Sequence, residues 1–210
     1  MGISERKVRE KEVLRRKIIQ AARELFAEGG YGNATLRQVA QKIEYSPTTI
    51  YLHFENKAEL LKTISEETLA PLADTFNAID EEFNDPILTL KNCGLAYVEF
   101  GLRHPNEYRL VFMDSQGWNE ESMDLSEEEE MPGQWVYESF QILVQDCIAQ
   151  GRLDPTDAET LTQVLWAALH GVVSLHLNYT RFAWIDQKAL ATEVIDAIIR
   201  GSGPKSKIFD

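Results

Sequence analysis

Hydrophobic residues recur with the period of an α-helix along most of the chain. The first stripe follows the spacing i, i+4, i+7, i+8, i+11 and i+12 and consists of Leu14, Ile18, Ala21, Ala22, Leu25 and Phe26. Charged residues occupy the opposite face, and Gly29 and Gly30 end the stripe. The pattern predicts a first amphipathic helix that buries one face.

Two short helices are predicted next. Thr35 stands where an N-cap belongs, ahead of an apolar stripe made of Leu36, Val39, Ala40 and Ile43. A tight turn at residues 44–45 leads to Ser46 and Pro47, which are favoured as an N-cap and a first helical residue. This helix must be brief, because a further helix is predicted to start at Asn56, with an apolar face made of Leu60, Leu61 and Ile64.

A short second helix, a tight turn and a short third helix are typical of the helix-turn-helix, a DNA-binding motif. The N-terminal residues of the third helix face base edges in this motif, and here they are Pro47, Thr48 and Thr49. Threonine offers a hydroxyl and a methyl group to a base edge, whereas proline offers only apolar contact. The alternative is that these residues form no more than a well-capped helix start.

The remainder of the chain, from about residue 66 to 210, is also predicted to be helical. Helix starts are expected at residues 84–86, 104–105, 134, 154–155 and 185–186. Residues 115–132 are expected to form a long loop with an acidic, solvated stretch at 120–130. Since no run has the period of a strand and no internal repeat is found, the predicted fold is all-α, with a helix-turn-helix head over 1–62 and a helical bundle over 63–210.

Charge is distributed unevenly along the chain, whose formal net charge is −13. Residues 1–62 contain 12 lysines and arginines and 8 acidic residues, a net of +4, whereas the rest of the chain carries −17. A basic head on an acidic body often marks a module that binds a polyanion. The alternative is a charged helical end without a partner.

The sequence contains no recognisable catalytic or metal-binding motif. Two isolated cysteines, Cys93 and Cys147, give neither a zinc spacing nor a disulfide framework. A phosphate-binding loop, a nucleophile elbow and an HExxH motif are all missing, so no enzyme activity, metal or cofactor is expected. The charged N-terminal segment does not read as a secretory signal, and no apolar run approaches the roughly 18–20 residues of a membrane span. We therefore expect a cytoplasmic protein that does not enter a membrane.

The stretch from Thr35 to Lys57, TLRQVAQKIEYSPTTIYLHFENK, resembles the DNA-binding domain of the TetR family of bacterial transcriptional regulators. The similarity runs without gaps from about Ile18 to Leu61. Family members usually carry glycine where Glu44 stands. A non-glycine residue at positive φ costs on the order of 1 kcal/mol. The turn must therefore either avoid positive φ or carry mild strain.

Eight residues of the head are candidates for DNA contact: Thr35, Arg37, Pro47, Thr48, Thr49, Tyr51, His53 and Lys57. The resemblance places Tyr51 and His53 against phosphates; the alternative is a partly buried aromatic pair. Thr35 can present its helix start to the DNA backbone, and Lys57 can share a phosphate with free backbone N–H groups. Arg37 is expected to reach a base or a phosphate, against the alternative of a solvated helix face.

Two segments of the C-terminal part, His104–Phe112 (HPNEYRLVF) and Trp166–Gly171 (WAALHG), resemble the WHG-type ligand-binding domain of one TetR branch. The resemblance implies a pocket for a small-molecule effector in residues 63–210. Candidate effector-binding residues are Tyr97, Phe100, Phe112, Trp166 and His170. The aromatic candidates can equally be ordinary core residues.

The last two predicted helices carry apolar residues on more than one face. In a monomer, one of these faces would leave an exposed patch that includes Leu175, Leu177, Val194 and Ile198, and such patches usually mark association. Two helices from each subunit would form a four-helix interface. We therefore predict a homodimeric regulator, a repressor that a small-molecule effector releases from a palindromic operator. The alternative is a helical small-molecule-binding protein without operator function.

Overall fold

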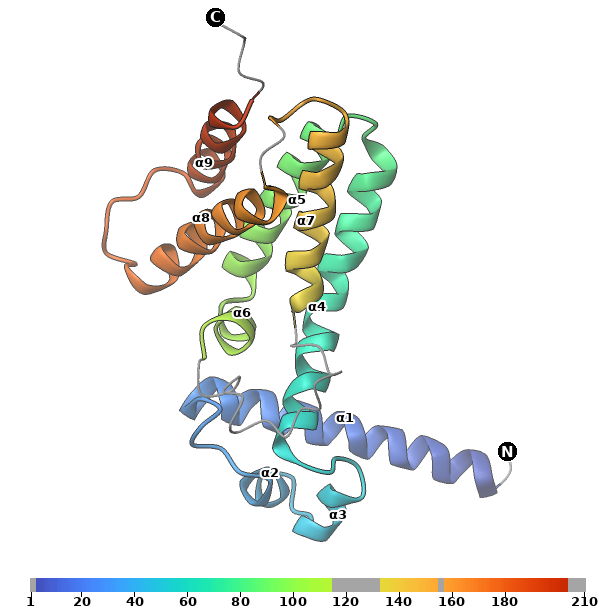
Figure 1. The fold of residues 1–210 in the computed structure, drawn as a ribbon. Helices are drawn as coiled ribbons and strands as arrows, with labels where there is room; N and C mark the ends of the chain where they lie inside the picture. Colours follow the sequence, from blue (N-terminus) through green and yellow to red (C-terminus); the bar gives the residue numbers. More distant parts are fainter. Residues whose placement is uncertain (1–2, 115–132, 155–156, 204–210) are drawn as a thin grey trace, which may run out of the picture. The chain divides into compact units, whose positions relative to one another are not determined.

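The computed structural model describes residues 3–114, 133–154 and 157–203, which form nine α-helices and no strand (Figure 1). The helices are α1 (Ile3–Gly29), α2 (Leu36–Lys42), α3 (Pro47–Tyr51), α4 (Lys57–Glu82), α5 (Pro86–Arg103), α6 (Pro105–Phe112), α7 (Gln134–Ala149), α8 (Ala158–Asn178) and α9 (Gln187–Gly201). The all-α prediction is confirmed. The predicted loop at 115–132 lies outside the described residues.

The chain forms two compact units. The first unit comprises residues 1–68 and 106–133, and the second comprises residues 69–105 and 134–210. This division differs from the predicted one in two ways. Residues 62 and 63 lie within the single helix α4, and the segment around α6 joins the first unit instead of the C-terminal one.

A single hydrophobic core holds the first unit together. Its largest fully buried side chains are Ile18, Ile50, Phe54, Leu60, Leu61 and Ile64. Leu110 of α6 packs into the same core, which explains why α6 belongs to this unit. The apolar stripes predicted for the first, second and fourth helices all contribute to this core, although Leu14, Leu25 and Ile43 are only partly buried.

N-caps define most of the helix starts. Thr35, Ser46, Asp85 and Asp186 each accept a hydrogen bond from a backbone N–H in the first turn of the helix that follows. These starts agree with the sequence analysis. The start of α8 does not, because its N-cap is Asp157 and the helix begins at Ala158.

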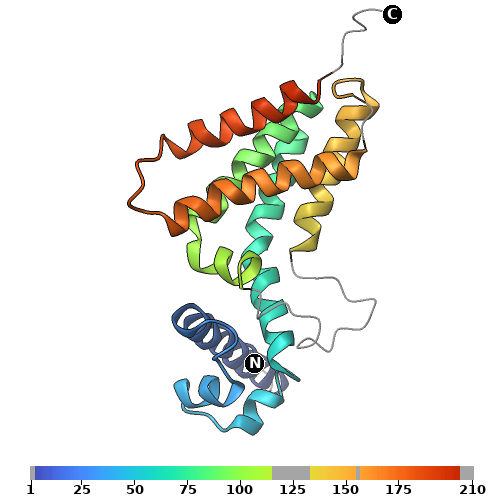
Figure 2. The same cartoon turned by 60° about the vertical axis from the view of Figure 1, so that its left-hand side comes forward.

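The second unit packs around α5, which contacts α7, α8 and α9 (Figure 2). Gly94 allows α5 to approach α9 closely, since a Cβ at this position would lie 2.9 Å from Cδ1 of Ile195. An ion pair between Lys91 and Asp196, at 2.7 Å, links the same two helices. The close approach and the ion pair together fix α9 against α5.

Helix α8 is long and apolar enough to span a membrane by length and composition, a property that the sequence analysis missed. Its residues Leu165, Leu169 and Val173 are fully buried in the second unit. The test by length and composition is weak evidence, since the core helix of a soluble protein also passes it, and the buried side chains of α8 pack within the second unit.

Both cysteines are free thiols buried in the second unit. Burial raises the pKa of Cys93 to about 12 and the pKa of Cys147 to about 11. Both side chains therefore act as small apolar core residues.

Candidate functional site

The starts of α2 and α3 present polar side chains to solvent at one end of the first unit, where the two helices pack against each other (Figure 1). Thr35 forms a capping box with Gln38: its hydroxyl accepts from the Gln38 N–H at 3.2 Å, and the Gln38 side chain accepts from the Thr35 N–H at 2.8 Å. Thr35 and Arg37 are both exposed. The start of α2 is thus rigid and accessible.

The N-terminal turn of α3 distinguishes its two threonines. Ser46 caps the helix through the N–H of Thr49, at 3.2 Å, and Pro47 is the first helical residue. The hydroxyl of Thr49 lies 2.9 Å from that of Ser46, and Thr49 is half-buried. Pro47 and Thr48 are exposed. Thr48 is therefore the more accessible threonine, although Thr49 was expected to be the main base reader.

Tyr51 and His53 lie at the C-terminal end of α3, on either side of the exposed Leu52. Tyr51 is 55% exposed, so its hydroxyl can reach a partner outside the chain. His53 is half-buried, and its Nδ1 is inaccessible and has no hydrogen-bond partner among the described residues. Burial, and then the charges of Lys11 and Arg15, lower the pKa of His53. The lowered pKa favours the neutral form of the ring.

Lys57 has internal partners. Its Nζ donates to the carbonyl oxygens of Tyr31, at 2.9 Å, and Ala34, at 3.0 Å, and lies 3.9 Å from the centre of the Tyr31 ring. Burial lowers the pKa of Lys57. The expected phosphate contact stays a prediction. In the structure, the ammonium group also stabilises the segment between α1 and α2 through hydrogen bonds to two of its carbonyl oxygens.

The turn between α2 and α3 adopts positive φ. Glu44 has φ 60°, the left-handed conformation that favours glycine. The N–H of Tyr45 donates to the carbonyl of Ala40 and the N–H of Glu44 to that of Gln41, which is the hydrogen-bond pattern of a Schellman motif. Of the two possibilities raised by the sequence, the strained turn is the one observed.

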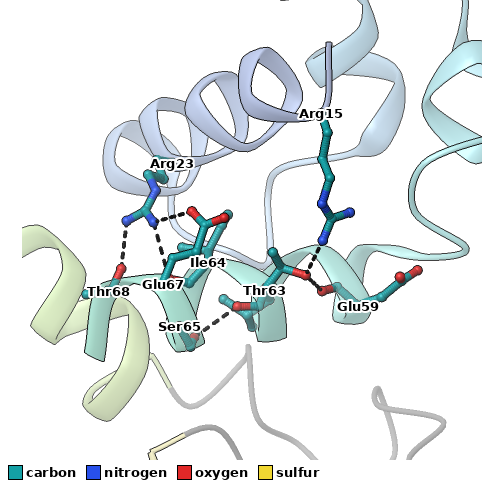
Figure 3. A network of polar contacts seen from close by, with 9 residues as sticks. Arg15, Arg23, Glu59, Thr63, Ile64, Ser65, Glu67 and Thr68 are labelled. Carbon is teal, nitrogen blue, oxygen red and sulfur yellow. Dashed lines mark hydrogen bonds and ion pairs between the residues drawn. The ribbon is translucent and has the colours of Figure 1, made fainter. Parts of the chain in front are cut away.

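Two arginines that the sequence analysis did not assign to this role fasten α1 to α4 (Figure 3). Arg23 donates to the hydroxyl of Thr68 at 2.6 Å and pairs with Glu67 at 3.1 Å. Arg15 donates to the hydroxyl of Thr63 at 3.4 Å, and its guanidinium carbon lies 4.4 Å from the centre of the Phe54 ring. These two arginines therefore join α1 to α4 in the first unit.

In the second unit, aromatic side chains form a cluster that includes two of the predicted effector residues. Trp166 donates through Nε1 to the hydroxyl of Tyr97 at 3.3 Å, and its ring lies 5.5 Å from that of Tyr137. Tyr97 also packs edge-on against Phe140. The hydroxyl of Tyr137 is buried and finds no hydrogen-bond partner in the described part of the chain. We name Tyr97, Tyr137, Phe140 and Trp166 the aromatic cluster.

Two of the other predicted effector residues, Phe100 and Phe112, pack against different rings. Phe100 packs against the ring of His104 at 5.1 Å, and Phe112 packs against Tyr108 in the first unit at 4.9 Å. His170 is half-buried, and burial lowers its pKa. Tyr137 was missed because a tyrosine in an amphipathic helix carries no sign in the sequence that its hydroxyl is unpaired.

A groove of about 560 Å³ runs along α5 in the second unit, and none of the predicted effector residues lines it. Its lining includes apolar side chains of α5, such as Leu95 and Leu102. Residues of α4 and the start of α9, among them Ile79 and Lys188, also line it. The groove has the size of a small-molecule site but is lined by both apolar and charged groups.

The predicted association patch is only partly exposed. Leu175 is 41% exposed, whereas Leu177, Val194 and Ile198 are half-buried. Ile198 also borders a small apolar cavity inside the second unit, so it is less available than expected. Val164 lies three turns before Leu175 on the same side of α8, is 49% exposed and was not predicted.

The fold and the exposed starts of α2 and α3 define a helix-turn-helix DNA-binding protein. Two protein-family models match the chain. The model described as "Bacterial regulatory proteins, tetR family" matches residues 18–64, and the model described as "Tetracyclin repressor-like, C-terminal domain" matches residues 90–198. The chain therefore belongs to the TetR family of bacterial regulators and is a DNA-binding transcriptional regulator.

Solved structures with the same fold share little sequence with this chain. A protein of unknown function from Rhodococcus sp. RHA1 is 21% identical, with TM-score 0.71 over 91% of this chain and 96% of that one. The ketosteroid transcriptional regulator KstR2 of Mycobacterium tuberculosis is 17% identical, with TM-score 0.66 over 91% and 95%. RolR in complex with resorcinol is 16% identical, with TM-score 0.63 over 94% and 91%.

Proposed function

We propose that this regulator is a cytoplasmic, homodimeric repressor that binds a palindromic operator and is released by a small-molecule effector. The observation that carries the DNA-binding part is the pair of capped, exposed helix starts at α2 and α3, held on a rigid framework by Arg15 and Arg23. Each subunit would read one half-site, with the half-sites about one helical turn apart.

We assign the eight candidate residues to two kinds of contact. Pro47, Thr48, Thr49 and Arg37 read base edges, whereas Thr35, Tyr51, His53 and Lys57 contact phosphates. Base contacts set sequence preference, and phosphate contacts set the affinity for all DNA and its dependence on salt. The exposure of Thr48 and the internal hydrogen bond of Thr49 make Thr48 an equal candidate for base reading.

An operator selected from random DNA with the purified protein allows a direct test. Thr49→Ala and Thr48→Ala should each weaken operator binding by roughly 1–3 kcal/mol if the residue reads a base, and should leave the affinity for random DNA almost unchanged. Tyr51→Phe should weaken both equally. Failure of the wild-type protein to enrich any DNA fragment would favour the alternative, a small-molecule-binding protein without operator function.

The dimer would form through α8 and α9. Val164 and Leu175 lie three turns apart on one side of α8, and both are exposed. In the dimer these side chains would be covered by the same helices of a second subunit, which would remove an exposed apolar stripe from solvent.

Leu175→Asp tests this interface, because it would bury an unpaired charge between subunits. The matched control is Ile142→Asp on α7, where the side chain is 58% exposed. Sedimentation should show monomers for Leu175→Asp and dimers for the control. A folded, dimeric Leu175→Asp protein would place the interface elsewhere.

The effector would bind at the aromatic cluster. The unpaired Tyr137 hydroxyl beside Trp166 favours an uncharged, largely apolar molecule that carries one polar group. A suitable test panel consists of neutral phenols with a single hydroxyl group, together with resorcinol, the two-hydroxyl phenol of the RolR structure. A panel member that releases wild-type protein from the operator should release Tyr137→Phe at least about fivefold less effectively. Equal release would remove Tyr137 from the site.

A further inference from the structure

We propose that Asp114 is a positioning residue for DNA binding, which fixes the connection between α1 and α2 and thereby the start of α2. This inference rests on the proposed DNA contacts of Thr35 and Arg37. An acidic side chain repels the phosphate backbone, so Asp114 acts through the protein and not by touching DNA.

The argument begins at the end of α1. Gly30 has φ 76°, and its N–H donates to the carbonyl of Phe26 at 2.9 Å. In this type of helix ending, the N–H of the next residue receives no partner from the helix. That residue is Tyr31, whose side chain is only 3% exposed. Its N–H therefore needs an acceptor from another part of the chain.

Asp114 supplies this acceptor. Its Oδ2 lies 2.8 Å from the backbone nitrogen of Tyr31, across a separation of 83 residues in the sequence. The residue follows α6, which is anchored in the first unit through Leu110. A hydrogen bond from a backbone N–H to a carboxylate is about twice as strong as one between neutral groups.

Lys57 holds the other side of the same residue. Its ammonium group accepts no hydrogen bond and donates to the carbonyl oxygens of Tyr31 and Ala34. The N–H of Tyr31 thus faces a negative charge, and its C=O faces a positive one. The charge of Asp114 also acts on Lys57 directly, since it opposes the lowering of the Lys57 pKa by burial.

These contacts lead directly to the DNA-contacting helix. Ala34 is buried, its carbonyl is held by Lys57, and the next residue is Thr35, the N-cap of α2. Loss of the Asp114 contact frees the Tyr31 peptide and with it the entry of the chain into α2. The side chain of Arg37 then loses its fixed position at the base edges, which weakens operator binding. The phosphate contact of Thr35 is also displaced, but it is one neutral hydrogen bond, and the charged phosphate contacts stay in place, so the affinity for random DNA changes much less.

Two variants with the same net charge test the proposal. Asp114→Ala removes both the charge and the acceptor, whereas Asp114→Asn removes the charge but keeps a carbonyl oxygen that can accept from Tyr31. Simple electrostatics predicts tighter binding of all DNA for both variants, because each removes one negative charge. The proposal predicts that Asp114→Ala binds the selected operator about tenfold more weakly than Asp114→Asn, whereas the affinities of the two variants for random DNA differ by less than about twofold and their slopes of log affinity against log salt are equal.

Circular dichroism shows whether each variant is folded. Titration with operator DNA at high concentration gives the fraction of protein that can bind, so affinities are compared per binding-competent molecule. Equal operator affinities for the two variants would overturn the proposal. A parallel loss on operator and random DNA would also overturn it, because that result indicates general damage to the head. Should Asp114→Ala not fold, Asp114→Ser, with a shorter acceptor, replaces it in the same comparison. If the wild-type protein enriches no operator, the proposed DNA-binding function itself is refuted. That result differs from a failure of the Asp114 proposal, in which the wild type binds an operator and the two variants bind it equally well.

Discussion

Replacement of Glu44 by glycine should stabilise the protein. Glu44 occupies the position of the Schellman motif that requires left-handed backbone, at φ 60°. An L-residue other than glycine pays roughly 1–2 kcal/mol for this conformation. Glycine avoids that cost but loses about 0.5–1 kcal/mol through the greater freedom of the unfolded chain. The net gain expected for Glu44→Gly is therefore about 0.5–1 kcal/mol.

The change in charge is separated from the relief of strain by a second variant. Glu44→Gln also removes the negative charge but retains the Cβ atom that causes the strain, so its stability should stay within about 0.3 kcal/mol of the wild type, as is usual for exposed positions. Urea denaturation followed by circular dichroism measures the free energy of unfolding. In thermal unfolding, a gain of this size raises Tm by roughly 1–4 °C for a chain of this length. If Glu44→Gly is no more stable than Glu44→Gln, the turn carries no strain and our interpretation of its geometry is wrong.

Three further predictions concern the charged and packed groups of the two units. Lys57→Met should destabilise the protein by about 1–3 kcal/mol in urea denaturation, because two carbonyl oxygens lose their partner, and an unchanged stability would leave only a phosphate role. Gly94→Val should cost about 1–3 kcal/mol through overpacking against Ile195, and thermal unfolding at or above the wild-type temperature would contradict it. Burial and neighbouring cations lower the pKa of His53 in the folded state, so the unfolded state binds the proton first. The stability of the wild type should therefore fall, relative to His53→Gln, as the pH drops below about 6.5, and a flat difference would show that His53 titrates alike in both states.

Local signals in the sequence were sufficient to predict much of the fold. The starts of α2, α3, α5 and α9 follow from N-caps and proline positions, because capping depends on residues within one turn. The start of α8 was placed too early because Asp154–Pro155 and Asp157 carry equally good local signals. Local chemistry alone does not decide between two such starts.

The candidate DNA-contacting surface was predicted, but the side chains that hold it were not. Arg23 meets Thr68 across 45 residues, and Asp114 meets Tyr31 across 83 residues. Helical periodicity shows which face of a helix a residue occupies, but it does not show which distant residue it meets. For the same reason, the sequence did not show that Thr48 is more exposed than Thr49, since the exposure of each depends on how α3 packs against the core.

The buried thiols have a practical consequence for experiments on this protein. With pKa values of about 12 and 11, fewer than about one in 1,000 of these cysteines is a thiolate at neutral pH, and the thiolate is the form that reacts with maleimides and oxidants. A single cysteine introduced at an exposed position away from the proposed DNA contacts, such as Ile142 on α7, would therefore be labelled selectively, without removal of Cys93 or Cys147. Fluorophores or spin labels could then report distances between two subunits on DNA in an otherwise unaltered chain.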